Sequence, residues 1–466
     1  MRIWKYLNCD NMDYESILKD IKPTSEEKKH VDDVSHRLME FLQKSCDEKG
    51  IDAKVTLVGS VAKNTALKGK SDIDIFIAFP LDTDKKYLKD KGLELAHECC
   101  VEFDTTPQHH FASHPYVTTD VEGCEVDIVP CYAINRGSEL KSAVDRTILH
   151  TRYVKEKLSK KQEDEVLLLK RFMAMTGTYG SEFKVGGFAG YLCELLIIHY
   201  GDFENTLKQA INWKHGHSID LENYNTSSLF EGDSLIVIDP TDMNRNVAAA
   251  LRLNKMAEFI QSARNYIFSD NKRDYFYPIE RNLKKEDVLN EFSKRNSDLI
   301  AIRFNIPDMP LDTLHPQLKK TCEALERKLN DEQFNVFKAD YWSDEILTGV
   351  ILLEMASSKL NDVKVNIGPK VFFNQACENF ASKYGRENCY VQGDFLVHTQ
   401  KREFPNAIDL VRFIFTQEHI NLIKVGKNLK KTIINTYEFI DIDEIENDDF
   451  LEFLDDFINP GQHISR

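Results

Sequence analysis

Large apolar side chains occupy every second position along residues 72–79 of this chain, and two carboxylates alternate with the first of them. Successive side chains of a β-strand point to opposite faces, so the apolar residues of this stretch share one face and its two carboxylates share the other. The apolar face holds Ile73, Ile75, Ile77 and Phe79, and the polar face holds Asp72 and Asp74. We therefore predict a strand that buries one face in a core and presents a pair of carboxylates on the other.

A second stretch, 121–130, alternates in the same way and predicts a neighbouring strand. Its apolar residues fall on one face and its acidic residues on the other, namely Val126 and Ile128 against Glu125 and Asp127. The pattern thus brings a third carboxylate, Asp127, to the sheet that carries Asp72 and Asp74. Glu125 shares its face and is a spare ligand or, as we favour, a structural partner.

Apolar residues with helical spacing predict helices over much of the remaining chain. In the N-terminal half these helices cover 14–49 (ending near Gly50), 93–100, 163–172, 188–200 and 247–268. In the C-terminal half we predict helices at 315–329 and within 369–384, and strands at 299–306, 335–342, 349–355 and 390–399. His109-His110 and 213–217 are interpreted as loops. No internal repeat or low-complexity segment interrupts this order.

The length of 466 residues predicts two to four domains. The element order favours an α+β multidomain fold with three parts. Residues 1–155 form an α/β catalytic domain, 156–275 a helical central domain, and 276–466 a C-terminal α+β part with an antiparallel sheet. Such a sheet is a common shape for binding RNA by its surface.

Composition narrows the class of protein further. Hydrophobic residues make up 42% of the chain, but no apolar run approaches the roughly 20 residues that a membrane span needs. The N-terminus lacks a signal-peptide pattern, and the ten cysteines form no C-x-x-C pair. We expect reduced, mostly buried thiols in a cytoplasmic protein without a membrane partner, with Cys131 serving in packing.

The net charge of −16 argues at first against a nucleic-acid partner. However, the segment 439–458 alone holds nine acidic residues and no basic one, so it carries more than half of that charge. Its apolar residues have helical spacing and predict an acidic amphipathic helix: Leu451, Leu454, Phe457 and Ile458. We interpret its acidic side as a solvated helix face.

The carboxylates suggest a chemistry. Close like charges repel, and folding alone gives no reason to hold Asp72 beside Asp74, whereas Mg²⁺ is bound by one or two carboxylates plus phosphate oxygens. Residues 57–65 are typical of a strand, a tight Gly59-Ser60 turn and a short helix, in which backbone N–H groups can approach phosphate. With Asp127 as third ligand, the pattern predicts a two-metal site for a nucleoside triphosphate. The alternative is a pair of solvated carboxylates on an edge strand.

These motifs, in this order, resemble the archaeal (class I) CCA-adding enzymes, the tRNA nucleotidyltransferases of the polymerase-β superfamily. Gly59-Ser60 with Asp72-x-Asp74 is shared across that superfamily and is a moderate signal by itself. The further matching segments make the resemblance specific: 114–117, 125–132, 142–150, 179–185, 187–194, 239–249 and His315-Pro316. The family usually has Arg at the position of Lys63 and Pro at that of Ile148.

The resemblance implies a function and partners. Members add C, C and A to the 3′ end of tRNA from CTP and ATP without a nucleic-acid template. Two Mg²⁺ ions promote attack of the tRNA 3′-hydroxyl on the α-phosphate, and pyrophosphate leaves. The C-terminal domains grip tRNA from the acceptor stem to the TΨC arm. The family is often dimeric, so a homodimer is a further expectation.

The resemblance also implies roles for single residues. The predicted catalytic and metal-binding residues are Asp72, Asp74 and Asp127. The predicted triphosphate contacts are Gly59, Ser60, Lys63, Lys170 and Tyr179, and the predicted contacts to the sugar and base are Thr147, His150 and Arg245. Arg245 reads the Watson–Crick edge of the base together with RNA phosphates.

Several of these residues have simpler interpretations. His150 and Tyr179 are compatible with packing, Lys170 with a snorkelling side chain, and Arg245 with a helix-entry residue paired to Asp242. Basic groups in the C-terminal half suit phosphate contacts or a solvated face about equally: Lys401, Arg402, Lys424, Lys427, Lys430 and Lys431. Two other functions also stay open, a poly(A)- or oligoadenylate-type polymerase and a catalytically inactive RNA-binding protein.

Overall fold

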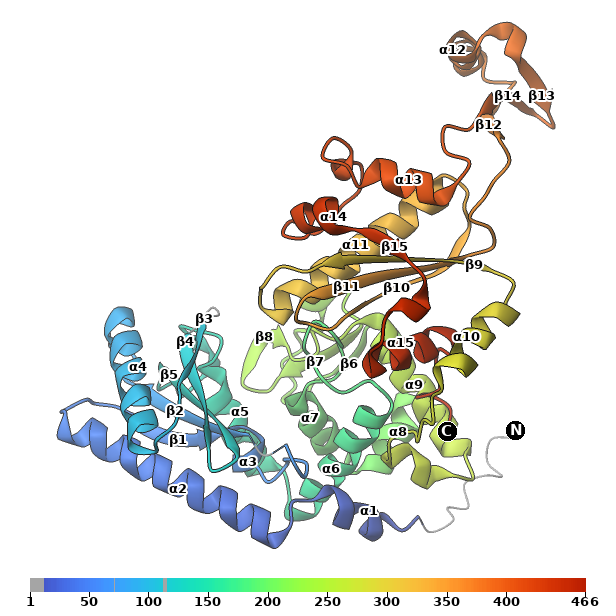
Figure 1. Ribbon diagram of the computed structural model, residues 1–466. Helices are drawn as coiled ribbons and strands as arrows, with labels where there is room; N and C mark the ends of the chain where they lie inside the picture. The colour runs from blue at the N-terminus through green and yellow to red at the C-terminus, as the bar shows by residue number, and fades with distance from the viewer. Residues whose placement is uncertain (1–11, 71, 112–114) are drawn as a thin grey trace. The chain divides into compact units, whose positions relative to one another are not determined.

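The computed structural model describes residues 12–70, 72–111 and 115–466. The chain divides into two compact units (Figure 1). Unit 1 comprises Met1–Glu280 together with Gly461–Arg466, and unit 2 comprises Arg281–Pro460. The chain therefore leaves unit 1, builds the whole of unit 2 and returns to unit 1 for its last six residues.

Unit 1 begins with a five-stranded mixed sheet of order β1-β2-β5-β4-β3. The strands are β1 (Lys54–Val58), β2 (Ile73–Phe79), β3 (Gln108–Phe111), β4 (Pro115–Val121) and β5 (Cys124–Tyr132), and only β2 and β5 pair in parallel among these neighbours. Helices α2 (Ser25–Glu48) and α4 (Lys85–Glu102) pack on the sheet face that carries Ile73, Ile75, Ile77 and Phe79 (Figure 1). The predicted apolar face of β2 and β5 is confirmed.

The opposite face of β2 is also buried next to the carboxylates. Phe76 and Ala78 pack there with Val58, Val129 and Cys131 in a small separate cluster. Cys131 is fully buried, which confirms its predicted packing role. Asp74 thus lies at the end of a strand whose two faces are both apolar, and this position removes much of its contact with water.

Three sequence predictions in this region are wrong in detail. The single helix over 14–49 is two helices, α1 (Tyr14–Ile21) and α2, because Pro23 forces Lys22 into an extended conformation and Thr24 then starts α2 with a capping box. The strand predicted over 121–130 begins only at Cys124, since Glu122 and Gly123 have positive φ and form a hairpin turn between β4 and β5. His109-His110, interpreted as a loop, lies in β3.

The rest of unit 1 is mainly helical. Its helices are α3 (Gly59–Ala62), α5 (Arg146–Lys157), α6 (Lys160–Met175), α7 (Gly190–Tyr200), α8 (Phe203–Ala210) and α9 (Leu253–Phe268), and α1, α6, α7, α8 and α9 share one apolar core. Unit 1 also contains strands that the sequence analysis did not predict, β6 (His217–Ile219), β7 (Leu235–Asp239) and β8 (Asp242–Asn246), of which β6 and β7 contribute to this core.

The helix predicted over 247–268 starts six residues late, at Leu253. The side-chain oxygen of Asn246 accepts hydrogen bonds from the backbone N–H groups of Val237 and Ala248, at 2.8 and 2.9 Å. These bonds hold a turn where the apolar spacing alone indicated helix. The loop interpretation of 213–217 is wrong at its last residue, because His217 begins β6.

Unit 2 is built on a four-stranded antiparallel sheet of order β10-β11-β9-β15, which confirms the predicted antiparallel sheet, although its fourth strand, β15, was not predicted. Its strands are β9 (Asp298–Asn305), β10 (Val336–Ser343), β11 (Thr348–Met355) and β15 (Glu438–Ile440), and its helices are α10 (Lys285–Lys294), α11 (Leu311–Asp331), α13 (Ala407–Ile414), α14 (Lys430–Thr436) and α15 (Asp448–Ile458). Helices α11, α13 and α14 pack on one face and α10 and α15 on the other (Figure 1).

Unit 2 also contains a second, smaller sheet. It has the order β12-β14-β13 and consists of β12 (Val363–Lys370), β14 (Phe395–Lys401) and β13 (Cys389–Gln392), next to α12 (Asn374–Tyr384) (Figure 1). The single strand predicted over 390–399 is wrong, because Gly393 with φ of +64° turns the chain between β13 and β14. Strand β12 was not predicted.

The acidic C-terminal helix forms as predicted. In α15 the apolar residues Phe450, Leu454, Phe457 and Ile458 are buried. Its acidic side also forms ion pairs, since Arg281 contacts Asp455 and Asp456.

The nine cysteines in the described part of the chain are free thiols. Across the same residues, no helix combines the length and the hydropathy that a transmembrane segment requires.

Candidate nucleotide and metal site

The predicted carboxylates meet where β2 and β5 run side by side. Asp74 and Asp127 are direct partners in the parallel register, and Asp72 is exposed just before β2. Desolvation, followed by the negative charges of Asp127 and Asp72, raises the pKa of Asp74 to about 6. The pKa of Asp127 is also raised, because burial outweighs the hydrogen bond from Thr118 and the charge of His110. The three carboxylates thus repel one another in the folded chain.

The Gly59-Ser60 turn lies directly against this acidic group. Val58, the last residue of β1, is the register partner of Asp74. Gly59 follows with φ of +72°, and a β-carbon placed on it would lie 1.8 Å from Oδ2 of Asp74. The chain then folds back in the short helix α3, where the carbonyl of Ser60 accepts the N–H groups of Lys63 and Thr65. The predicted strand, turn and short helix are therefore confirmed, and only glycine fits at position 59.

The donor set suits a hard divalent cation. Burial and the neighbouring carboxylates raise the pKa of Asp74, and a cation at this position would oppose both effects. Within 12–70, 72–111 and 115–466, no group of three or more His, Cys, Asp or Glu side chains is arranged to hold a metal ion by itself. Mg²⁺ would therefore need further ligands here, and that ion takes one or two carboxylates and completes its shell with water and substrate phosphate oxygens.

Both lysines among the predicted triphosphate contacts, Lys63 and Lys170, approach the same buried carboxylate. Glu194 of α7 has no exposed side-chain surface, and its Oε2 accepts a hydrogen bond from Nζ of Lys63 at 2.6 Å. Its Oε1 accepts one from the hydroxyl of Thr65 at 2.6 Å and lies 3.5 Å from Nζ of Lys170. Lys170 also donates to the carbonyl of Thr65 at 2.8 Å. The snorkelling interpretation of Lys170 is therefore wrong, since its ammonium ends inside the protein.

Tyr179 precedes α7 in the sequence, and its hydroxyl lies beside Gly190, the first residue of that helix. It forms an isolated bridge with Phe188 and is largely buried, and burial raises the pKa of its hydroxyl. A β-carbon on Gly190 would come within 3.2 Å of the Tyr179 hydroxyl and 3.4 Å of Nζ of Lys170. The absence of a side chain at Gly190 thus lets both predicted triphosphate contacts approach the first turn of α7.

Two of the three predicted base and sugar contacts, His150 and Arg245, meet at a second buried carboxylate, Asp239. Its Oδ2 accepts from Nη1 of Arg245 at 2.8 Å and lies 2.9 Å from Nε2 of His150. The amide and hydroxyl of Thr241 bind Oδ1. The imidazole of His150 stacks on the ring of Tyr191, with centroids 3.9 Å apart and an interplanar angle of 15°.

This arrangement corrects the alternative drawn for Arg245. Arg245 lies on β8 and pairs with Asp239, so it is not a helix-entry residue bound to Asp242. Asp242 instead faces Arg146 at 3.3 Å. Although burial alone would raise it, the pKa of Asp239 is held well below its usual range by His150 and Thr241. Burial in turn lowers the pKa of His150, more than Asp239 raises it.

Tyr191 connects the two buried carboxylates. Nζ of Lys63 lies 5.9 Å from the centroid of the Tyr191 ring, and the same ring stacks with His150. Lys63 also opposes the raised pKa of Asp74 through its positive charge. Thr147 lies three residues before His150 on α5, which places both on one side of that helix. The predicted residues therefore form one connected region of unit 1, and their roles in binding stay predictions.

The sequence analysis missed four residues of this region: Thr65, Tyr191, Glu194 and Asp239. Glu194 could have been found, because it interrupts an otherwise apolar helix and a buried acid requires a partner. Asp239 gives a similar signal at the end of the apolar strand β7. Thr65 and Tyr191 carry no such signal, since a Thr in a turn and a Tyr in a helix are ordinary.

The basic groups of unit 2 are mostly open to solvent. Lys424, Lys427 and Lys431 are exposed around α14, while Lys430 is half-buried and donates to Asn421 at 2.6 Å. Lys401 is exposed, and Arg402 donates to the carbonyl of Glu332 at 3.2 Å. This exposure is compatible with both interpretations of the basic groups, which stay open.

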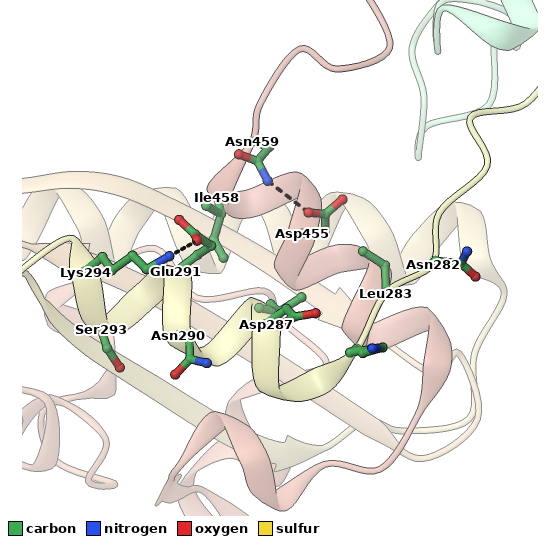
Figure 2. A pocket seen from close by; sticks show the side chains of 12 residues that line it. Asn282, Leu283, Asp287, Asn290, Glu291, Ser293, Lys294, Asp455, Ile458 and Asn459 are labelled. Carbon is green, nitrogen blue, oxygen red and sulfur yellow. Dashed lines mark hydrogen bonds and ion pairs between the residues drawn. The ribbon is translucent and has the colours of Figure 1, made fainter.

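Unit 2 also has a groove of about 520 Å³ between α10 and α15 (Figure 2). Charges of both signs line it, and its Lys294 ammonium already pairs with Glu291 at 2.5 Å. Asn459 donates to Asp455 at 2.9 Å on the opposite helix (Figure 2). None of the predicted site residues line this groove, and its mixed charge indicates no particular ligand.

Comparison with known proteins first defines the class. A family model described as a nucleotidyltransferase domain matches residues 38–150, the part that contains the Gly59 turn and all three carboxylates. A model for the second domain of tRNA nucleotidyltransferases matches 164–277, and one for the C-terminal domain of CCA-adding enzymes matches 295–441. The fold is that of a nucleotidyltransferase, a class that generally works with divalent metal ions.

Relatives over the whole length then define the family. The chain is 44% identical to a CCA-adding enzyme of Methanothermobacter thermautotrophicus, over 97% of this chain and 99% of that one. It is 38% identical to a CCA-adding enzyme of Methanosarcina acetivorans, over 94% and 96% of the two chains. The chain belongs to the family of CCA-adding enzymes.

Proposed function

We propose that this protein adds C, C and A to the 3′ end of tRNA, using CTP and ATP and no nucleic-acid template. The observation that carries the proposal is the pairing of Asp74 with Asp127 beneath the Gly59 turn, in a chain 44% identical to a CCA-adding enzyme over almost its full length. The reaction joins the tRNA 3′-oxygen to the nucleotide α-phosphorus and releases pyrophosphate.

In this proposal Asp72, Asp74 and Asp127 hold two Mg²⁺ ions. When bound, these ions neutralise the triphosphate and lower the pKa of the attacking hydroxyl. Thr118 orients Asp127 through its hydrogen bond, and β2 and β5 fix the separation of Asp74 and Asp127. Such fixed geometry matters because phosphoryl transfer depends on positioning and charge neutralisation.

The triphosphate would lie along the Gly59-Ser60 turn. Without a side chain at Gly59 the phosphates can approach the backbone and the carboxylates together. The Lys63 ammonium has three protons and one hydrogen-bonded partner in the described part of the chain, which leaves two for phosphate oxygens. Lys170 already makes three contacts, so it would have to exchange one to reach a phosphate.

Base recognition would fall to Arg245, with His150 beside it at the same oxygen of Asp239 and Thr147 on the same side of α5 as His150. Asp239 binds Nη1 of Arg245, so Nε and Nη2 of the guanidinium would face the base edge. The exposed lysines of unit 2 would meet the phosphates of the acceptor stem and TΨC arm.

One family model falls on each of the proposed parts 1–155, 156–275 and 276–466, which supports that division. A homodimer stays an expectation that sedimentation of the pure protein would test.

An incorporation assay tests the function. Purified protein with Mg²⁺ is given tRNA transcripts that end before CCA, after C and after CC, with labelled CTP or ATP separately. We expect CTP addition to the first two transcripts and a single A on the third. Long A-tails on any RNA primer would indicate a poly(A)-type polymerase instead. Binding of tRNA without incorporation would indicate an inactive RNA-binding protein.

A further inference from the structure

Glu194 is a fully buried acid that belongs to no predicted role. It lies in α7, whose other inward-facing side chains are apolar, including Leu192, Leu195 and Leu196. An ionised carboxylate in such a place is unfavourable unless it is paired and hydrogen-bonded. Glu194 meets that requirement with groups from the nucleotide-binding turn and from α6.

The contacts of Glu194 divide between its two oxygens. Oε2 faces Lys63, and Oε1 faces both the Thr65 hydroxyl and the Lys170 ammonium. The side chains of Lys63 and Lys170 are only 8% and 3% exposed. Burial lowers the pKa of Lys170, and the charge of Glu194 opposes that shift. With both lysines protonated, one carboxylate neutralises one of two ammonium groups, and the cluster keeps a single surplus positive charge beside the Gly59-Ser60 turn.

The surplus charge makes the cluster suitable for an anion. Although burial opposes ionisation, the pKa of Glu194 is lowered because Lys63 and Lys170 favour its charged form. Without the carboxylate, two ammonium groups would remain together in a dry site, where like charges repel strongly. The lysines would then separate or lose a proton, and in either case the turn would lose a defined donor for phosphate.

We propose that Glu194 is a positioning residue for the triphosphate. It holds the Lys63 ammonium at the Gly59-Ser60 turn and, through Thr65 and Lys170, fixes the end of that turn to α6 and α7. The inference rests on the proposed function, since it assigns the triphosphate to this turn. It adds that affinity for the phosphates depends on a residue that does not itself touch the nucleotide.

The test is Glu194→Gln, compared with Glu165→Gln as matched control. Glu165 is a partly buried acid of α6 in the same unit, and the hydrogen bond that it accepts comes from the Phe203 amide and not from either lysine. Loss of a hydrogen bond to a charged group predicts that Glu194→Gln raises KM for CTP and for ATP about ten- to a hundredfold. Inhibition by pyrophosphate should weaken in parallel, while the preference between CTP and ATP and the affinity for tRNA stay as in the parent protein.

A double-mutant cycle separates positioning from general loss of stability. If Glu194 acts through Lys63, then Glu194→Gln should add little to KM once Lys63→Met is present. Thr65→Val serves as the milder variant should Glu194→Gln fail to fold, and we expect a smaller rise in KM in the same direction. Thermal unfolding of each variant identifies those that fold.

Three outcomes would overturn the inference. The first is an unchanged KM and pyrophosphate inhibition in folded Glu194→Gln. The second is additivity with Lys63→Met. The third is an equal loss in Glu165→Gln. Each leaves CCA addition by the parent protein intact, so failure of the inference is distinguishable from failure of the proposed function, in which the parent protein adds no nucleotide.

Discussion

Gly59 and Asp74 approach so closely that the glycine has no room for a side chain. A β-carbon at position 59 would lie 1.8 Å from Oδ2 of Asp74, and the glycine has φ of +72°. The turn proposed to contact triphosphate and a carboxylate proposed to bind a cation are therefore in van der Waals contact. A substitution at either residue changes the environment of the other.

We predict that Gly59→Ala lowers incorporation at least a hundredfold while the protein stays folded. Gly69 provides the matched control, because it has φ of +70° and a β-carbon added there would meet no described atom within 4 Å. Both variants should lose about 1 kcal/mol of unfolding free energy to the left-handed backbone. Single-turnover incorporation and thermal unfolding measure the two effects. Equal activity in the two variants would show that contact with Asp74 is unimportant.

Asp74→Asn and Asp127→Asn should each abolish incorporation, because each removes a fixed negative charge from the proposed cation site. Glu125→Gln on the same strand as Asp127 is the control, since Glu125 is exposed on β5. We also expect Asp74→Asn to leave the fold intact or to stabilise it, because it removes a charge whose burial and repulsion by Asp127 and Asp72 raise the pKa of Asp74. Mg²⁺-dependent incorporation and urea unfolding check both expectations.

Asp239 should make unit 1 sensitive to acid. Its pKa is depressed in the folded chain, so its contribution to stability is present above its unfolded pKa of about 4 and is lost as the pH falls below that value. At pH 7, Asp239→Asn should cost about 3 kcal/mol, the usual loss when one partner of a buried pair is removed.

The difference between the parent protein and Asp239→Asn should therefore shrink as the pH falls below 4. Urea unfolding followed at pH 7 and pH 3 measures it. Asp242→Asn lies in the same hairpin and removes the contact to Arg146, so it controls for loss of an ion pair. A constant difference across this pH range would contradict the prediction.

Tyr191 should act through its ring and not through its hydroxyl. The ring stacks on His150 at 3.9 Å, whereas the contact of the hydroxyl to Asp239 is long, at 3.5 Å. We predict near-parental incorporation by Tyr191→Phe and about a tenfold loss of kcat/KM by Tyr191→Leu, because an aromatic pair contributes about 1 kcal/mol beyond its buried area. Steady-state kinetics with CTP and ATP distinguish the two. Equal losses in both variants would assign the role to the hydroxyl.

Local patterns predicted the part of the site that lies on strands. The two-residue period placed Asp74 and Asp127 on matching faces, and the structure confirms their register. The same period failed at Glu122 and at Gly393, where a hairpin turn continues the apolar alternation without a break. Strands β6, β7 and β8 were missed because they are short and lie among helices, where tertiary packing outweighs local pattern.

The buried polar groups were the least predictable part of the site. Glu194 lies 131 residues from Lys63 along the chain, and Asp239 lies 89 residues from His150. No periodicity within one segment contains such a pairing. The resemblance to a family identified several of the cationic members, but their acidic partners could be found only once the helices and the β7–β8 hairpin were placed together.

The return of the chain to unit 1 has a consequence for biosynthesis. The segment Gly461–Arg466 contacts unit 1 through Arg466, which donates to the carbonyls of Met175 and Tyr277, and through Asn265, which donates to that of Ile464. About 180 residues separate Glu280 from this segment, so a ribosome working at roughly 5–20 residues per second delivers it about 10–40 s later. Until then the carbonyls of Met175, at the end of α6, and of Tyr277 lack these partners in the nascent unit 1, and a chaperone could engage it during that interval.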